Sequence, residues 1–376
     1  MLTTNDRNRR FAWWAGVAVL LLPLGVSAQE PLAVPTQQAA EASTAETETI
    51  VIGTAADGQP ITIELDKKRT GDLIRGAVGL LRQKLIGESS ERMGLVDDQR
   101  WTGADDPNRW VILVHGFASG IDATEPLLKR LDRPGIASRR FAYPNDGPIR
   151  DASDQLSKAL RNLARQYPDR KLTIIAHSMG CLVSRHVLES PERNPGNVDQ
   201  LIMVAPPNHG SHLAQFPVGV DVEALAANVR QENVRWIVES ALEGGMGSAQ
   251  VDLRPESPLF VELNTRPRNP RVRYTIFAGT AGPLDAEEAH RMEKMGNDLK
   301  TDNGAVTAIS GQLVAAGRSD EMIVGRGDGA VSLESAKLPG VEDFVPLPFN
   351  HSVLSNGLET PAGKRLIEEI VSRIVL

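Results

Sequence analysis

The chain has 376 residues, of which 41% are hydrophobic, and a formal net charge of −7. This length and composition are those of a globular protein with one large domain or two small ones. Lys and Arg form no basic stripe along the sequence and only 4% of the residues are aromatic, so the chain lacks the charge pattern of a nucleic-acid-binding protein.

The first 28 residues have the pattern of an export signal. Arg7, Arg9 and Arg10 precede the apolar run FAWWAGVAVLLLPLGV, and small residues follow up to Ala28. We expect cleavage after Ala28 and an exported protein, periplasmic or secreted. An uncleaved anchor helix is the alternative, but the run is short for a membrane crossing and Pro23 interrupts it. The pair Arg9 and Arg10 leaves a twin-arginine signal open beside general export.

Two short regions follow the signal. Residues 29–48 are poor in large apolar side chains and rich in Ala, Thr, Gln and Glu, which predicts a flexible linker. Within residues 49–100, two alternating runs surround the turn sequence ADGQ, and helical periodicity follows at residues 73–86. We expect a small N-terminal extension made of a β-hairpin and a helix, whose function the sequence does not disclose.

From residue 101 to the C-terminus, short β-branched runs alternate with amphipathic stretches. This alternation predicts an α/β domain in which a mostly parallel central sheet is flanked by helices on both faces. The predicted strands are WVILVHG, SRRFAYP, KLTIIAH, QLIMVAP, RVRYTIFAGT and DFVPLP, and the predicted helices lie at residues 124–131 and 152–166, from residue 179, and at residues 363–375.

The segment IIAHSMGCL puts Ser178 where a strand ends and a helix begins. Such a serine can be a helix N-cap, or a nucleophile on a tight strand-to-helix turn. Ala176 and Gly180, two positions away on either side, are small enough for strand and helix to pass closely. The usual nucleophile pattern has glycine in both places, so the motif alone leaves both interpretations open. Cys181, the single cysteine, is expected to be a small buried side chain and not a reactive thiol.

A catalytic serine needs a base, an acid that orients the base, and two amide donors for the oxyanion. The strand VILVHGF ends in a His-Gly pair, and we expect the backbone amides of Phe117 and Met179 to form the oxyanion hole. His351 follows the apolar run VPLP and is the expected base. Asp328, between two glycines, is the expected acid.

Other acids and histidines compete for these roles. Asp320 also precedes His351 and is the alternative acid, whereas Asp343 is expected to sit at the start of the last strand. The remaining histidines have other expected roles: His115 and His177 are tied to strand ends, His186 is structural on a helix, His290 is solvated, and His209 and His212 could line the cleft.

Together the motifs AHSMG, VHGF, APPNHGS, GDGAVS and FNHSVL resemble the α/β-hydrolase superfamily, nearest to its secreted bacterial lipases and esterases. The resemblance covers residues 106–376 in architecture, and AHSMG is similar to a known small-lipase variant with alanine first. It implies an α/β-hydrolase fold with Ser178 as nucleophile, His351 as general base and Asp328 as acid. The implied reaction is hydrolysis of carboxylic esters, with lipid or other acyl esters as expected substrates. No cofactor, metal or nucleic-acid partner is expected, and contact with a membrane surface stays open.

Residues 207–262 form a long insertion with helical spacing of apolar residues. It is either a mobile lid over the site or a set of helices that packs on the core. The same catalytic groups would also suit an amidase, a peptidase or an acyltransferase, and a binding protein could keep the fold without using them.

Overall fold

A computed structural model describes residues 47–54, 59–66, 93–96, 109–117, 119–144, 147–215, 222–231, 237, 248–299 and 304–375. The chain divides into two compact units, Met1–Ala45 and Glu46–Leu376, and all described residues belong to the second. The predicted export signal, almost all of the predicted linker and the helix predicted at residues 73–86 lie outside the described residues.

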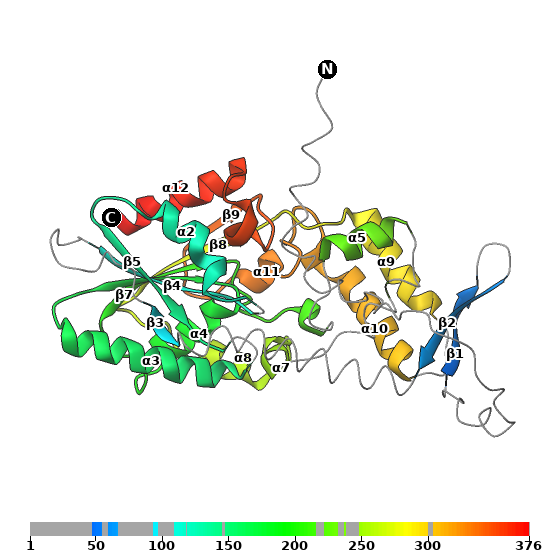
Figure 1. Ribbon diagram of the computed structural model, residues 1–376, viewed down its shortest axis with the longest axis horizontal. Coiled ribbons are helices and arrows are strands. Elements are labelled where there is room, and N and C mark those ends of the chain that lie inside the picture. Colours follow the sequence, from blue (N-terminus) through cyan, green and yellow to red (C-terminus); the bar gives the residue numbers. More distant parts are fainter. Residues whose placement is uncertain are drawn as a thin grey trace, which may run out of the picture. The chain divides into compact units, whose positions relative to one another are not determined.

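A seven-stranded sheet forms the centre of the second unit, in the order β3-β5-β4-β6-β7-β8-β9 (Figure 1). All neighbouring strands are parallel except β3, which pairs antiparallel with β5. The fold is therefore the α/β-hydrolase fold, as the sequence implies. The strands are β3 (Gly94–Val96), β4 (Arg109–Val114), β5 (Ile136–Ala142), β6 (Leu172–His177), β7 (Val198–Val204), β8 (Arg273–Gly279) and β9 (Asp343–Leu347).

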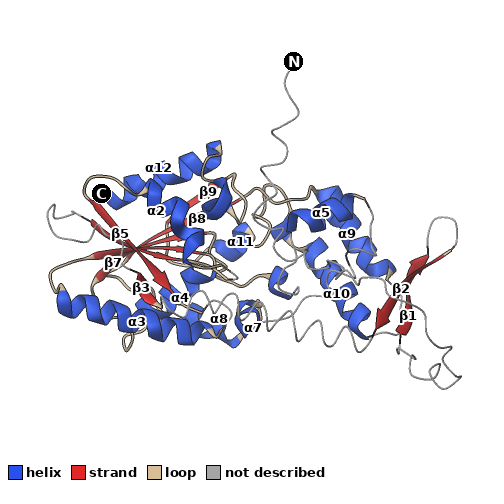
Figure 2. Ribbon diagram, viewed as in Figure 1, coloured by secondary structure: helices blue, strands red, loops and turns tan. Residues whose placement is uncertain are grey.

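Helices cover both faces of this sheet (Figure 2). In β4, Ile112 and Val114 join the core under α3 and α4, whereas Val111 and Leu113 join the core under α2 and α12. The central strands carry consecutive apolar residues, at 111–114, 174–176 and 201–204, because each face of the sheet is buried. The covering helices are α2 (Glu125–Arg130), α3 (Ile149–Gln166), α4 (Met179–Leu188), α7 (Ser248–Leu253), α8 (Pro258–Thr265) and α12 (Pro361–Val375).

The sheet extends beyond the boundary that the sequence predicts at residue 101. Its edge strand β3 belongs to the region expected to form a separate extension, and three residues are too few to show an alternating pattern. Earlier in the chain, β1 (Thr47–Thr54) pairs antiparallel with β2 (Pro60–Asp66), where the sequence predicts a hairpin. Among the described residues, no helix has the length and apolar character that crossing a membrane requires.

Three helices build a further hydrophobic core, smaller than the cores on the two faces of the sheet, which we call the helical cluster: α5 (Val222–Arg230), α9 (Ala286–Asp298) and α10 (Gly304–Arg318) (Figure 1). Val229 of α5, Met292 of α9 and Leu313 of α10 are buried in it. The predicted insertion at residues 207–262 is thus divided, because α5 joins the cluster while α7 and α8 pack on the main core. The other two helices of the cluster come from a second insertion, between β8 and β9, which the sequence did not single out.

Short elements complete the connections around the sheet. They are the 3-10 helices η4 (Ile121–Thr124), η5 (His212–Gln215) and η6 (Asp320–Met322), the short helix α11 (Leu333–Ala336) and the π-helix η7 (Val353–Gly357). Of these, η5 follows β7, and η6 follows α10 on the way to the loop of Asp328.

Candidate active site

Ser178 lies on a strained turn between β6 and α4. Its φ of 51° and ψ of −124° are unusual for a residue with a side chain, and its amide donates to the carbonyl of Val204 at 3.0 Å. A Cβ atom at Gly180 would lie 2.4 Å from the carbonyl oxygen of His115, so only glycine lets α4 pass this close to the end of β4. The Ser178 hydroxyl makes no N-cap hydrogen bond to α4. Its role is therefore not to cap the helix.

Instead, Ser178 is the first member of a chain of hydrogen bonds that joins three distant segments. The Ser178 hydroxyl lies 2.9 Å from Nε2 of His351, and Nδ1 of His351 lies 2.9 Å from Oδ2 of Asp328. A carboxylate accepts only, so Nδ1 of His351 carries the proton and Nε2 is free to accept the proton of the serine. The structure thus brings together the three residues that the sequence nominates as nucleophile, base and acid.

Asp328 is held by its own loop in a fixed orientation. Its Oδ1 accepts from the amides of Ala330 at 3.0 Å and Val331 at 2.8 Å, which leaves Oδ2 for the imidazole. Its carbonyl accepts from the amide of His351 at 2.8 Å. The Asp328 side chain is almost fully buried, whereas that of His351 keeps 24% of its surface exposed. Solvent therefore reaches the imidazole but not the carboxylate behind it.

The other acids are placed differently. Asp320 is partly exposed and bonds to Arg326 at 3.1 Å, so the structure brings Asp328, and not Asp320, to His351. Asp343 opens β9, where it accepts from Thr275 at 2.7 Å and pairs with Arg373. Its position at the start of the last strand is the one that the sequence predicts.

The electrostatics of His351 favour its charged form. Burial opposes the charge, but the attraction and hydrogen bond of Asp328, together with the charge of Glu321, outweigh it and raise the pKa of His351 above its ordinary value. An imidazole in this setting can take up the proton of the serine and hold it near a compensating carboxylate.

Segments on two sides of Ser178 hold the predicted oxyanion donors. Gly116 packs against the serine, since a Cβ atom there would lie 3.0 Å from Ser178 Cβ, and Phe117 follows it in the turn after β4. Met179 is the first residue of α4, where amides have no partner within the helix. Tyr143 fixes the first segment by donating to the carbonyl of His115 at 2.6 Å and stacking on its ring. The role of these two amides stays a prediction.

His177 is a residue whose place at the site the sequence did not reveal. Its Nε2 donates to the carbonyl of His351 at 2.9 Å, and the two ring centroids lie 5.0 Å apart. Burial lowers the pKa of His177 to about 3, so its ring stays neutral beside His351. It was expected to be tied to a strand end. Its link to a residue 174 positions away depends on the fold.

The remaining nominated side chains lie outside the Ser178 chain of hydrogen bonds. His186 is buried against Glu262 at 3.1 Å, and the His290 side chain is 77% exposed beside Glu293. His209 and His212 follow β7, each with an exposed side chain. Cys181 is buried, its thiol donates to the carbonyl of Ala176 at 3.2 Å, and burial raises its pKa.

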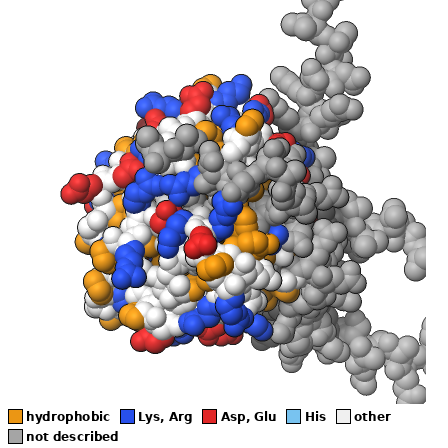
Figure 3. Space-filling model, turned by 90° about the vertical axis from the view of Figure 1, so that its left-hand side faces the viewer, with side chains coloured by type: hydrophobic (Ala, Val, Ile, Leu, Met, Phe, Trp, Pro, Cys, Tyr) orange, Lys and Arg blue, Asp and Glu red, His pale blue; other side chains and the backbone are white. Residues whose placement is uncertain are grey.

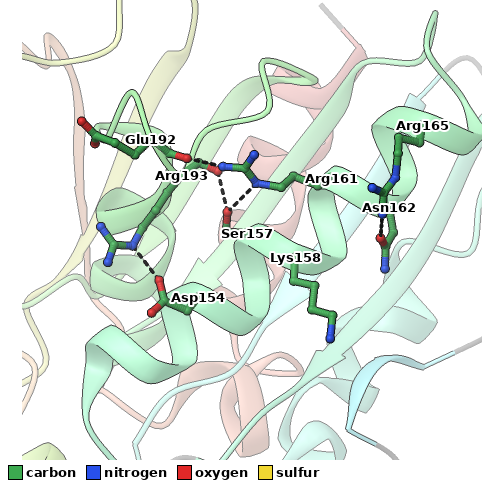
Figure 4. Close-up of a pocket in the computed structure, with 8 residues that line it drawn as sticks. All are labelled: Asp154, Ser157, Lys158, Arg161, Asn162, Arg165, Glu192 and Arg193. Carbon is green, nitrogen blue, oxygen red and sulfur yellow. Dashed lines mark hydrogen bonds and ion pairs between the residues drawn. The ribbon is translucent and has the colours of Figure 1, made fainter.

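A surface pocket of about 490 Å³, whose lining does not include Ser178, lies along α3 and the turn after α4 (Figure 4). Two of its cations serve local structure: Arg193 bonds to Asp154 at 2.8 Å, and Arg161 bonds to Ser157 and to the carbonyl of Glu192. On the face of the molecule in Figure 3, Lys and Arg are likewise mixed with acidic and hydrophobic side chains.

Comparison with known proteins agrees with the fold. Residues 105–242, less than half of the chain, match the model of a family described as serine aminopeptidase, S33. No curated protein matches the chain. Similar solved structures include the mature Bacillus licheniformis lipase BlEst2, with 18% identity, a TM-score of 0.46 and coverage of 73% of this chain and 96% of that one. Phospholipase PlaB from Legionella pneumophila has 17% identity, a TM-score of 0.43 and coverage of 71% and 63%.

A Paleococcus ferrophilus monoacylglycerol lipase has 16% identity, a TM-score of 0.40 and coverage of 72% and 95%. The family match and the observed strand order confirm the resemblance to the α/β-hydrolase superfamily. Likenesses as distant as those three do not indicate what this chain acts on.

Proposed function

We propose that the protein is a serine hydrolase that cleaves carboxylic esters, with Ser178 as nucleophile, His351 as general base and Asp328 as the acid that orients the base. The observation that supports it best is the continuous chain of 2.9 Å hydrogen bonds from the Ser178 hydroxyl through His351 to Asp328. A structural serine would need none of these partners, and Ser178 does not cap its helix.

The mechanism follows from the direction of each hydrogen bond. Nε2 of His351 takes the hydroxyl proton as Ser178 attacks the ester carbonyl, and Asp328 stabilises the imidazolium that forms. The amides of Phe117 and Met179 are the proposed donors to the oxyanion. The imidazolium then gives its proton to the leaving alcohol, and the acyl group stays bound to Ser178. A water molecule next attacks the acyl carbonyl while Nε2 of His351 takes a proton from it. The imidazolium finally returns this proton to the oxygen of Ser178 as the carboxylic acid leaves.

Esters of lipid or other acyl chains are the proposed substrates, on the strength of the lipase-like and esterase-like motifs around Ser178 and His351. Amide or peptide hydrolysis is the second candidate, because the matched family is described as serine aminopeptidase. Both reactions proceed through the same kind of acyl-enzyme and differ only in whether an alcohol or an amine leaves. The catalytic residues therefore do not distinguish ester hydrolysis from amide hydrolysis.

One experiment tests the catalytic proposal. The purified protein is treated with a fluorophosphonate, the adduct is mapped by mass spectrometry, and ester, thioester and amide hydrolysis are compared in wild type and Ser178→Ala. We expect a single adduct on Ser178 and loss of ester hydrolysis to background in a folded Ser178→Ala variant. An adduct elsewhere, or unchanged turnover in that variant, would overturn the assignment.

We further propose that the protein is exported and loses its signal after Ala28, as the basic and apolar N-terminal segments indicate. N-terminal sequencing of the protein from its native host tests this directly. A mature chain that begins at Gln29 supports export, and an intact N-terminus contradicts cleavage.

A further inference from the structure

Glu321 is a buried carboxylate that the proposed mechanism does not use. It lies in η6, seven residues before Asp328, and only 2% of its surface is exposed. Its Oε1 accepts from the amide of His212 at 2.7 Å, and its Oε2 accepts from the amide of Leu213 at 3.0 Å and from the Ser211 hydroxyl at 3.4 Å. Both carboxylate oxygens thus bind one short segment after β7, at the start of the first insertion.

The backbone of Glu321 is joined to the loop of Asp328. Its carbonyl accepts from the amide of Gly329 at 2.8 Å, and a Cβ atom at Gly327 would lie 2.5 Å from that carbonyl oxygen. On the other side, Leu213 packs against the helical cluster. Glu321 therefore connects the segment that leads into the cluster with the loop that holds the acid.

Burial disfavours the ionised form of the Glu321 carboxylate. Burial is the main cause that raises the pKa of Glu321 to about 7, and the charge of Asp328 acts in the same direction. The hydrogen bonds from the amides of His212 and Leu213 act in the opposite direction and lower the pKa. In turn, the charge of Glu321 helps to raise the pKa of His351. Carboxylates in such positions concentrate at functional sites. The charged or titratable groups around Glu321 are Asp328 and His351 in the site, His212 on η5, and the exposed pair of Asp320 and Arg326.

We propose that Glu321 is a positioning residue: it ties residues 211–213, at the start of the helical cluster, to the Asp328 loop, and its negative charge supports the protonated form of His351. The second half of this proposal rests on the proposed hydrolase function, whereas the tie between the two segments does not. Ionised Glu321 satisfies three donors at once, which a neutral side chain of the same shape cannot do.

The test compares Glu321→Gln with Asp320→Asn, a neighbouring change that also removes one negative charge but lies at the surface. Glutamine offers one acceptor oxygen in place of two, so at least one amide in residues 211–213 loses its partner. We expect hydrogen exchange of a peptide that covers residues 211–215 to become about tenfold faster in Glu321→Gln, in line with the loss of one hydrogen bond. Asp320→Asn should leave that exchange at the wild-type rate.

The second measurement is the pH profile of kcat/KM for an ester. Because the pKa of Glu321 is about 7, part of its charge is present near neutral pH. Removal of that charge should move the acidic limb of the Glu321→Gln profile to lower pH by about half a unit, while Asp320→Asn leaves it in place. The milder variant Ser211→Ala removes one donor to the carboxylate. It should change the exchange rate and the acidic limb in the same directions as Glu321→Gln, but by less. This variant keeps the proposal testable if Glu321→Gln does not fold. Wild-type exchange rates in a folded Glu321→Gln variant would overturn the tie.

If exchange becomes faster in Glu321→Gln but the acidic limb does not move, the proposed effect of the Glu321 charge on His351 is overturned and the tie between the two segments stands. If the wild type hydrolyses no ester, the hydrolase proposal fails, and the exchange measurement still decides whether Glu321 ties the two segments.

Discussion

Replacement of Asp328 by Asn is the perturbation whose outcome the structure predicts in most detail. The amides of Ala330 and Val331 both donate to Oδ1 of Asp328. In Asp328→Asn the side-chain oxygen must keep this position, because an NH2 group there would face two donors. The NH2 group of Asn then points at Nδ1 of His351, which must accept. The proton of the imidazole is thereby forced onto Nε2, which can no longer accept from Ser178.

The size of the effect follows from this change of tautomer. In a serine protease whose triad aspartate was replaced by asparagine, the geometry was retained and kcat fell by about 10⁴. At 1.36 kcal/mol for each factor of ten, this is about 5 kcal/mol of lost transition-state stabilisation. Because Asn keeps both hydrogen bonds to the loop, we expect a small change in stability, about 1 kcal/mol for the altered contact with His351.

The assay is ester turnover at pH 8 together with the rate of fluorophosphonate labelling, with thermal unfolding as a check of the fold. Asp320→Asn is the matched control, since Asp320 bonds to Arg326 at the surface, and its turnover should stay within about twofold of wild type. Turnover of Asp328→Asn within tenfold of wild type, or an equal loss in Asp320→Asn, would refute the assigned acid.

Three further predictions concern packing, pH and substrate length. Gly180→Ala should destabilise the protein by about 2 kcal/mol or more, because its Cβ would lie 2.4 Å from a backbone oxygen. The control Gly311→Ala, in α10 with open space around it, should stabilise by up to about 1 kcal/mol; equal melting temperatures for the two variants would contradict this. The pKa of His351 is raised and its protonated ring cannot accept from Ser178, so kcat/KM should fall as the pH drops through this raised pKa; a flat profile from pH 5 to 8 would count against His351 as base. In a series of esters with acyl chains from acetyl upward, each methylene that the enzyme buries should add about 0.8 kcal/mol to transition-state binding, measured through kcat/KM, until the acyl-binding site is full. The series is measured below the micelle concentration beside matched amides, and a flat series would indicate a small-ester esterase.

Much of the fold was predictable because a sheet covered on both faces leaves a strong local signal. β4 and β6 are runs of β-branched and other apolar residues, and their observed bounds lie close to the predicted segments. The helical cluster was not predictable as a unit. The periodicity of α5 shows that one face is apolar, but nothing local shows that this face packs against α9 and α10 from a second insertion.

At the site, sequence order nominated Ser178, His351 and Asp328, but it left Asp320 as an alternative. The sequence does not show which carboxylate the loop turns toward the imidazole. In the structure it is Asp328, whose Oδ1 accepts two backbone amides and whose Oδ2 faces His351. Glu321 had no local signal, because its partner amides lie more than 100 residues earlier in the chain. Residues that act through a positioned neighbour are visible only once distant segments are in contact.

Both insertions are joined to the segment that leads into the loop of Asp328. The second insertion closes at its base through two hydrogen bonds, from the amide of Leu284 to the carbonyl of Met322 at 3.0 Å and from the amide of Val324 to the carbonyl of Leu284 at 2.8 Å. The first insertion joins the same loop through the carboxylate of Glu321. The helical cluster is therefore joined to the Asp328 loop by two links of different chemistry. The backbone link does not titrate near neutral pH and the carboxylate link does. Hydrogen exchange in residues 211–215 should therefore become faster as the pH falls below about 7, after correction for the intrinsic exchange rate, if the Glu321 carboxylate holds that segment.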